Sequence, residues 1–169
     1  MDLYIGTKTV LSKPMNLRDY SNLRGWEIPD DQDGDDEGYL VEYLDGGKPN
    51  LQGYEGYVSW SPKAQFENAY RRTTGLSFGL ALEAAKMGKR IARTGWNGKG
   101  MWVAYTPGST FPPGLAREGH AAKHRANESP TTDITLLPHL DMRAADGSMV
   151  IGWLASQTDM LADDWEILE

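Results

Sequence analysis

The second half of the chain orders its short apolar segments as a helix, several strands, a short helix and a final strand, and this order constrains the fold most. Apolar residues recur at helical spacing over 78–85, where Ser77 is placed to cap the helix and Gly88 to end it. Strands and a short helix are expected at 89–93, 101–105, 137–143, 148–151 and 156–169. This order predicts an α+β fold whose N-terminal helix packs on a small antiparallel sheet.

The first part of the chain has a different pattern and predicts a separate small α+β domain. Strands are expected at Leu3–Ile5, Gly38–Leu44 and Tyr54–Trp60, and helices at Asn16–Asn22 and from Pro62 to about Arg72, with Ser61 as N-cap. The two patterns meet near 73–76, so we expect domains at 1–73 and 77–169. Residues 106–136 are rich in Pro, Gly, Thr and charge and predict one long loop.

Charge excludes several classes of partner. The net charge of −7 argues against binding a nucleic-acid polymer, but residues 77–102 hold five basic residues against one acidic residue. Such a cationic segment within an acidic protein favours a compact anion as ligand.

No apolar run approaches the roughly 18 residues of a membrane span, and cysteine is absent. We therefore expect a cytoplasmic protein with no membrane partner, no disulfide and no thiolate metal site.

The turn over residues 93–102, RTGWNGKGMW, contains the parts of a nucleotide-binding surface. Trp96 offers a flat face for stacking, Arg93 and Lys99 supply positive charge, and Asn97 both donates and accepts hydrogen bonds. Its glycines, Gly98 among them, let a ligand approach backbone N–H groups. The spacing fits neither standard phosphate-binding loop. The alternative is a hairpin with Asn97-Gly98 as a type I′ turn and the tryptophans in the core.

The tail over residues 152–165, GWLASQTDMLADDW, places polar residues between two tryptophans. Ser156 and Asp159 have the spacing of a capping box, which would start the short helix without any ligand. Asp163 and Asp164 are candidates for a metal-binding or acid–base pair, but adjacent carboxylates on a helix diverge, and an exposed acidic helix end is the favoured interpretation. His120 and His124 have the i, i+4 spacing of a metal site on a helix, but no Glu follows His120 as in HExxH. The acidic run 30–37 resembles the EF-hand spacing only loosely, so neither a metal nor a cofactor is expected.

The sequence FGLALEAAKMGKRIARTGWNGKGMWV, together with PHLDMRAADGSMVIGWLASQTDMLADDWEI, resembles the Thoeris anti-defense type 2 family of phage proteins. The likeness covers most of 77–169. It implies a sponge, not an enzyme, which binds a cyclic ADP-ribose isomer made by bacterial Toll/interleukin-receptor-type immune enzymes. Glycocyclic ADP-ribose is the expected signal, and some members also take up cyclic di- or trinucleotides. The likeness further implies a homotetramer with ligand pockets between subunits, acting in the cytoplasm of the infected bacterial host.

Carried over by position, the resemblance implies ligand contacts in both motifs. The implied residues are Phe78, Arg93, Trp96 and Asn97 in the first motif, and Trp153, Ser156, Gln157 and Asp159 in the second. Residues 1–73, with PMNLRDY and GYVSWSPKAQFENAY, resemble a small domain attached to other phage proteins, whose function the sequence does not supply.

Two other functions stay open at this level. One is a phosphodiesterase or glycohydrolase that degrades the same signals with Asp159 and Asp163 or Asp164. The other is a phage structural protein in which the tryptophans are only core residues.

Overall fold

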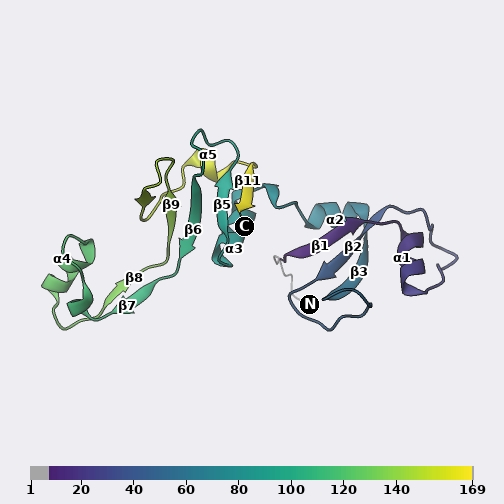
Figure 1. Ribbon diagram of the computed structural model, residues 1–169, viewed down its shortest axis with the longest axis horizontal. Helices are drawn as coiled ribbons and strands as arrows, with labels where there is room; N and C mark the ends of the chain where they lie inside the picture. The colour runs from purple at the N-terminus through teal and green to yellow at the C-terminus, as the bar shows by residue number, and fades with distance from the viewer. Residues whose placement is uncertain (1–7, 169) are drawn as a thin grey trace. The chain divides into compact units, whose positions relative to one another are not determined.

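The computed structural model describes residues 8–168 and divides the chain into two compact units, Met1–Arg72 and Thr73–Glu169 (Figure 1). The expected α+β class is confirmed: each unit combines short helices with antiparallel strands. The strand expected at Leu3–Ile5 lies outside the described residues. Within residues 8–168, no helix has the length and apolar character needed to cross a bilayer.

The N-terminal unit is built on a three-stranded antiparallel sheet in the order β1-β2-β3. Its elements are β1 (Val10–Pro14), α1 (Leu17–Arg24), β2 (Gly38–Tyr43), β3 (Tyr57–Pro62) and α2 (Lys63–Ala69). Strand β1 was not expected from the sequence, since most of its side chains are exposed and show no apolar alternation. The hydrophobic core of this unit includes Tyr20, Leu40 and Val58, with Trp60 packed against them.

Helix α1 has clear signals at both ends. The Asn16 side chain accepts a hydrogen bond from the Asp19 N–H at 2.8 Å, and Gly25 ends the helix in the left-handed region with φ of 67°. The expectation that Ser61 and Pro62 begin the next helix is wrong. Both belong to β3, where Pro62 pairs with Gly38, and α2 begins at Lys63 without a side-chain cap. The extended backbone of Pro62, which lacks an N–H, suits the end of an edge strand.

The C-terminal unit contains a six-stranded antiparallel sheet in the order β10-β9-β6-β5-β11-β4, so the sheet is larger than expected. Its strands are β4 (Thr74–Leu76), β5 (Arg90–Arg93), β6 (Trp102–Thr106), β9 (His139–Arg143), β10 (Met149–Val150) and β11 (Trp165–Leu168). The helices α3 (Phe78–Lys86) and α5 (Gln157–Met160) complete this part. The last strand of the sequence thus lies between β5 and β4 and joins the two ends of the domain.

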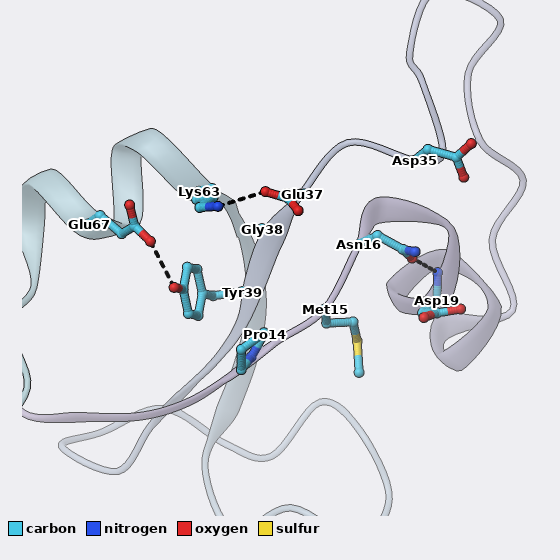
Figure 2. A pocket seen from close by; sticks show the side chains of 10 residues that line it. All are labelled: Pro14, Met15, Asn16, Asp19, Asp35, Glu37, Gly38, Tyr39, Lys63 and Glu67. Atoms are coloured by element: carbon cyan, nitrogen blue, oxygen red, sulfur yellow. Dashed lines mark hydrogen bonds and ion pairs between the residues drawn. The ribbon is translucent and has the colours of Figure 1, made fainter.

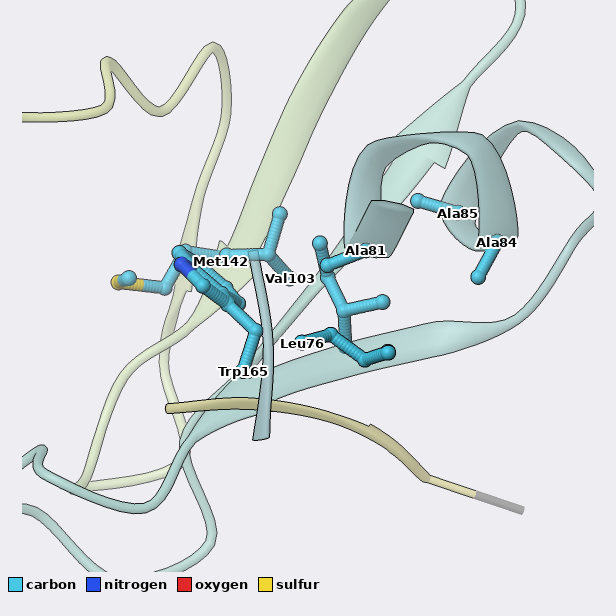
Figure 3. Packing of buried hydrophobic residues seen from close by; sticks show 8 residues of the cluster. Leu76, Ala81, Ala84, Ala85, Val103, Met142 and Trp165 are labelled. Carbon is cyan, nitrogen blue, oxygen red and sulfur yellow. The ribbon is translucent and has the colours of Figure 1, made fainter. Parts of the chain in front are cut away.

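Helix α3 packs on the sheet through its alanines (Figure 3). Ala81 and Ala85 are fully buried and meet Ile91, Val103 and the fully buried Trp165. Small residues on the helix let it approach the sheet closely, and Trp165 is the largest fully buried side chain among the described residues. Ser77 occupies the N-cap position of α3, but its side chain makes no capping hydrogen bond, contrary to the expectation.

The single long loop expected over 106–136 is also wrong. This segment forms the hairpin strands β7 (Ser109–Phe111) and β8 (Ile134–Leu136), the short 3₁₀ helix η1 (Pro113–Leu115) and helix α4 (Ala121–Glu128). A small separate core of Ala116, Ala126 and Ile134 holds them together. Alanines make a weak apolar pattern, so composition alone concealed these elements.

Candidate functional site

Three tryptophans of the C-terminal unit, Trp96, Trp153 and Trp165, pack edge to face and form what we call the tryptophan cluster. Their ring centroids lie 5.4 Å apart for Trp96–Trp165, 6.1 Å for Trp96–Trp153 and 6.4 Å for Trp153–Trp165. Phe78, at the start of α3, lies 5.2 Å from Trp165. Trp165 is fully buried, whereas the other three rings are half-buried. Those three are therefore held in place while part of their surface remains accessible.

Arg93, at the end of β5, ties the cluster to the tail of the chain. Its Nε donates to Asp164 Oδ1 at 2.7 Å and its Nη1 to Asp159 Oδ1 at 2.8 Å. Its Nη2 also reaches Asp164 Oδ2 at 3.4 Å, and the side chain is only 17% exposed. These carboxylates raise the pKa of Arg93, so the guanidinium stays charged. One positive charge thus faces two negative charges within the protein itself.

Asp159 connects α5 to Trp96 as well as to Arg93. Its Oδ1 accepts from the Trp96 indole N–H at 3.1 Å, and its Oδ2 accepts from the Ser156 N–H at 3.2 Å and the Ser156 hydroxyl at 2.6 Å. Ser156 and Asp159 form the capping box that their spacing predicted. Burial acts to raise the pKa of Asp159, but the hydrogen bonds from Ser156, Arg93 and Trp96 outweigh it and lower this pKa to about 2.

The glycine-rich turn starts with a close contact to Asp164. The Gly95 N–H donates to Asp164 Oδ2 at 2.8 Å, and a Cβ on Gly95 would lie 2.5 Å from the same oxygen, so a larger residue would displace this carboxylate. The hydrogen bond from Arg93 and that from Gly95 lower the pKa of Asp164. The hairpin alternative is confirmed in part, because β5 and β6 pair as antiparallel strands and Trp96 packs against the core. Its type I′ turn is wrong: within residues 8–168 every positive φ belongs to a glycine, which excludes Asn97 from such a turn.

The structure therefore brings together six of the predicted ligand residues. Phe78, Arg93, Trp96, Trp153, Ser156 and Asp159 are linked by ring contacts or hydrogen bonds. Asn97, Lys99 and Gln157 are exposed beside them, and Gly98 is half-buried. A Cβ on Gly98 would lie 2.4 Å from Met101 Sδ, so this glycine packs against protein. Within residues 8–168, none of these four makes a hydrogen bond, ion pair or ring contact with the tryptophan cluster.

Sequence reasoning missed two residues of this site. Asp164 was interpreted as part of an exposed helix end, but it is the main partner of Arg93. Trp165 was treated only as the end of the polar tail, but it is the buried centre of the cluster. The available signal was their place at the start of the expected strand 165–168. Neighbouring side chains of a strand point to opposite faces, so a buried Trp165 would place Asp164 on the other face.

The N-terminal unit has a cleft of about 560 Å³ with a different lining (Figure 2). Lys63 Nζ lies 2.7 Å from Glu37 Oε2, and the Tyr39 hydroxyl donates to Glu67 Oε1 at 2.9 Å. The Lys63 and Glu37 side chains are 50% and 74% exposed, so this pair is well solvated. None of the predicted ligand residues belongs to this unit. Within residues 8–168, no three His, Asp or Glu side chains are grouped so that they could hold a metal ion.

Comparison with known proteins covers the C-terminal unit. Residues 76–168 match the family described as the Thoeris anti-defense 2-like domain. A similar protein is "Thoeris anti-defense 2" of Bacillus phage SP01, which is 34% identical over 96 residues, covering 56% of this chain and 97% of that protein. The match to the family includes Arg93, the tryptophan cluster and both carboxylates that hold Arg93.

Proposed function

This chain belongs to the Thoeris anti-defense 2-like family, and from that premise we propose that it is a phage-encoded sponge for a cyclic ADP-ribose isomer, glycocyclic ADP-ribose. In this proposal residues 77–169 form the binding domain and residues 1–73 a separate domain. The protein binds the signal stoichiometrically in the cytoplasm of the infected host and leaves it intact. Cyclic di- and trinucleotides are further candidate ligands of the same protein.

The observation that carries the proposal is the half-buried aromatic surface of Phe78, Trp96 and Trp153. Adenine is flat and apolar on its faces, and rings with a fixed orientation stack on it with little loss of side-chain entropy. Trp96 is fixed by its hydrogen bond to Asp159 and by the rings of Trp153 and Trp165. A preorganised surface of this kind suits tight binding, because less ordering is required when the ligand arrives.

The charges of the site refine the roles that the resemblance implies. Arg93 directs its donors at Asp159, Asp164 and the Thr158 carbonyl, so we propose that it mainly orients the surface. Lys99 is exposed on the glycine-rich turn, so its flexible side chain can bring a positive charge to a phosphate of the ligand. Asn97 and Gln157 are exposed and can supply hydrogen bonds to ribose or base.

Exposed apolar side chains support the homotetramer with pockets between subunits. They gather in one stretch of the chain and comprise Met149, Val150, Ile151, Leu154, Met160 and Leu161, with Leu154 at 90% exposure. This stretch includes Trp153 and Ser156 of the candidate site. Large exposed apolar side chains are candidates for burial by a second subunit. Leu154 follows Trp153 in the chain, so a subunit that covers Leu154 would lie beside the tryptophan cluster.

The degrading enzyme is less well supported. A general acid must carry a proton near neutral pH, but the pKa of Asp159 is about 2 and that of Asp164 is also lowered. Both carboxylates are engaged by Arg93. The purely structural role is also less well supported. Part of the Trp96 ring is accessible, and a residue that serves only as core has no need of an accessible face.

The proposal is tested by incubating the full chain with glycocyclic ADP-ribose, removing unbound ligand and denaturing the protein by heat. We expect one intact molecule of signal to be recovered for each occupied site. Competition with a host receptor requires a nanomolar Kd, about −12 kcal/mol, and ligand at about 100 times Kd should add about 2.7 kcal/mol to the stability. Recovery of a cleaved product would establish the enzyme instead.

Trp96→Ala separates binding from structure. We expect a folded protein with at least a hundredfold weaker binding, about 2.7 kcal/mol, because the main stacking surface is removed. Trp26→Ala is the matched control, since Trp26 is 54% exposed and lies in the other unit. Global unfolding of Trp96→Ala, with the wild type giving no thermal shift, would favour the structural protein.

A further inference from the structure

Asp141 is a buried carboxylate for which the predicted ligand contacts provide no role. It lies on β9 at 8% exposure, opposite Ala104 of β6. The Thr106 hydroxyl donates to its Oδ2, and His139 Nε2 lies 3.5 Å from its Oδ1. His139 and Asp141 are two residues apart on one strand and Thr106 pairs with His139, so all three share one face of the sheet.

The remaining hydrogen bond of Asp141 leads to the candidate site. Its Oδ1 accepts from the Gly152 N–H at 3.0 Å, where Gly152 adopts a left-handed backbone with φ of 74°. In the next residue, the Trp153 N–H donates to the carbonyl of Leu140 at 2.7 Å. Two successive backbone groups of the turn are thus held by two successive residues of β9. The turn fixed in this way carries the Trp153 ring to within 6.1 Å of Trp96.

The geometry points to Asp141 as a positioning residue for the ligand-binding surface. It sets the Gly152–Trp153 turn, and thereby the angle between the Trp153 and Trp96 rings, without touching the ligand itself. A charged acceptor makes stronger hydrogen bonds than a neutral one, and burial keeps water from replacing them. This inference rests on the proposed function, because only a ligand that contacts Trp153 makes its position matter for binding.

Asp141→Asn tests the role, because the amide nearly preserves the shape while removing the charge. In the full chain, at a temperature where every variant is folded, we expect calorimetry with glycocyclic ADP-ribose to show about tenfold weaker binding. In a Trp153→Ala background the same substitution should change Kd by less than about twofold, since interacting residues are non-additive. The near-ultraviolet circular dichroism of the coupled tryptophans should also change without ligand.

Glu42→Gln is the matched control. Glu42 is 9% exposed on β2 and accepts two backbone N–H groups, from Glu55 and Gly56, in the other unit. We expect this variant to lower the melting temperature and leave Kd unchanged. An Asp141→Asn protein with wild-type Kd, or with an effect fully additive to that of Trp153→Ala, would overturn the positioning role and leave Asp141 a stabilising residue only.

Two further outcomes remain decisive. When wild-type protein does not bind glycocyclic ADP-ribose, the proposed function fails, but an unchanged circular dichroism spectrum of Asp141→Asn still overturns the positioning role. When Asp141→Asn does not fold, Gly152→Ala disturbs the same turn at the residue whose N–H Asp141 accepts. Its Cβ meets no atom within 4 Å, so the strain comes only from the positive φ. The same weakening of Kd is expected there, and a wild-type Kd contradicts the inference.

Discussion

Among residues 8–168, each unit buries one carboxylate on an inner strand, Glu42 on β2 and Asp141 on β9. Glu42 accepts two backbone N–H groups of an irregular segment, and Asp141 accepts one. Glu42 holds the approach to β3, in a region with no predicted ligand residue. Asp141 holds the turn that carries Trp153. The same chemical device thus stabilises a loop in one unit and orients an aromatic surface in the other. The difference lies in what the held segment carries.

Ion pairs extend this contrast. In the N-terminal unit the Lys63–Glu37 pair has side chains 50% and 74% exposed, and in the C-terminal unit the Arg93–Asp159 pair has side chains 17% and 14% exposed. Shielded charges interact more strongly than solvated ones and leave larger penalties when one partner is removed. The contrast therefore predicts unequal effects of equivalent substitutions in the two units.

The largest effect is expected for the buried centre of the tryptophan cluster. Trp165→Ala should lower the free energy of unfolding of the C-terminal unit by about 3–5 kcal/mol, because Trp165 is fully buried. Trp26→Ala, which removes a ring 54% exposed in the other unit, should cost less than about 1 kcal/mol. Urea unfolding followed by hydrogen exchange of peptides from each unit measures both. Equal effects would show that the cluster is not a well-packed core.

Removal of Arg93 should have the next largest effect. Arg93→Leu leaves Asp159 and Asp164 without their shared cation and should cost about 2–3 kcal/mol. Lys63→Met, which breaks the solvated pair with Glu37, should leave the urea midpoint unchanged. Arg93→Lys should recover part of the loss, since it keeps the charge but not the planar fork. The contrast between units breaks down when both substitutions shift the midpoint alike.

Acid should destabilise the C-terminal unit more than the N-terminal unit. The pKa of Asp159 falls from 3.8 to about 2 on folding. A carboxyl whose folded pKa is lower stabilises the fold above its unfolded pKa, and this contribution of about 1–2 kcal/mol is lost as the pH falls from about 4 through 2. Unfolding free energies measured from pH 5 to pH 2 should show this slope. Asp159→Asn should flatten it, and a slope that persists in this variant assigns the effect to other carboxyls.

Much of the secondary structure of the C-terminal unit could be predicted from the sequence, because its apolar residues recur at helical or strand spacing and its caps have recognisable residues. Helix α3, the paired strands β9 and β10, and the capped turn of α5 all follow local patterns. The elements of 106–136 could not, since their small core uses alanines such as Ala116 and Ala126. The order of the sheet, with β11 between β5 and β4, depends on contacts between distant segments that no local pattern contains.

The site was predictable in composition but not in its connections. The motifs supplied Arg93, Trp96 and Asp159, and the capping box of Ser156 was readable from spacing. The pairing of Arg93 with two carboxylates could not be predicted. A sequence does not show whether the partner of a charged side chain is another part of the protein or a ligand. Asp164 in particular lies 71 positions from Arg93. Only the folded sheet brings them together.

The smallest effect compares two helix caps. Asn16→Ala and Ser156→Ala each remove a side-chain acceptor for an N-terminal N–H, and each should cost about 1 kcal/mol in its own unit. Their effects on binding should differ, because Ser156 also donates to Asp159, which orients Trp96. We expect Ser156→Ala to weaken binding of glycocyclic ADP-ribose a few-fold in calorimetry. Asn16→Ala should leave Kd unchanged, and an equal loss in both variants would mean that the N-terminal unit takes part in binding.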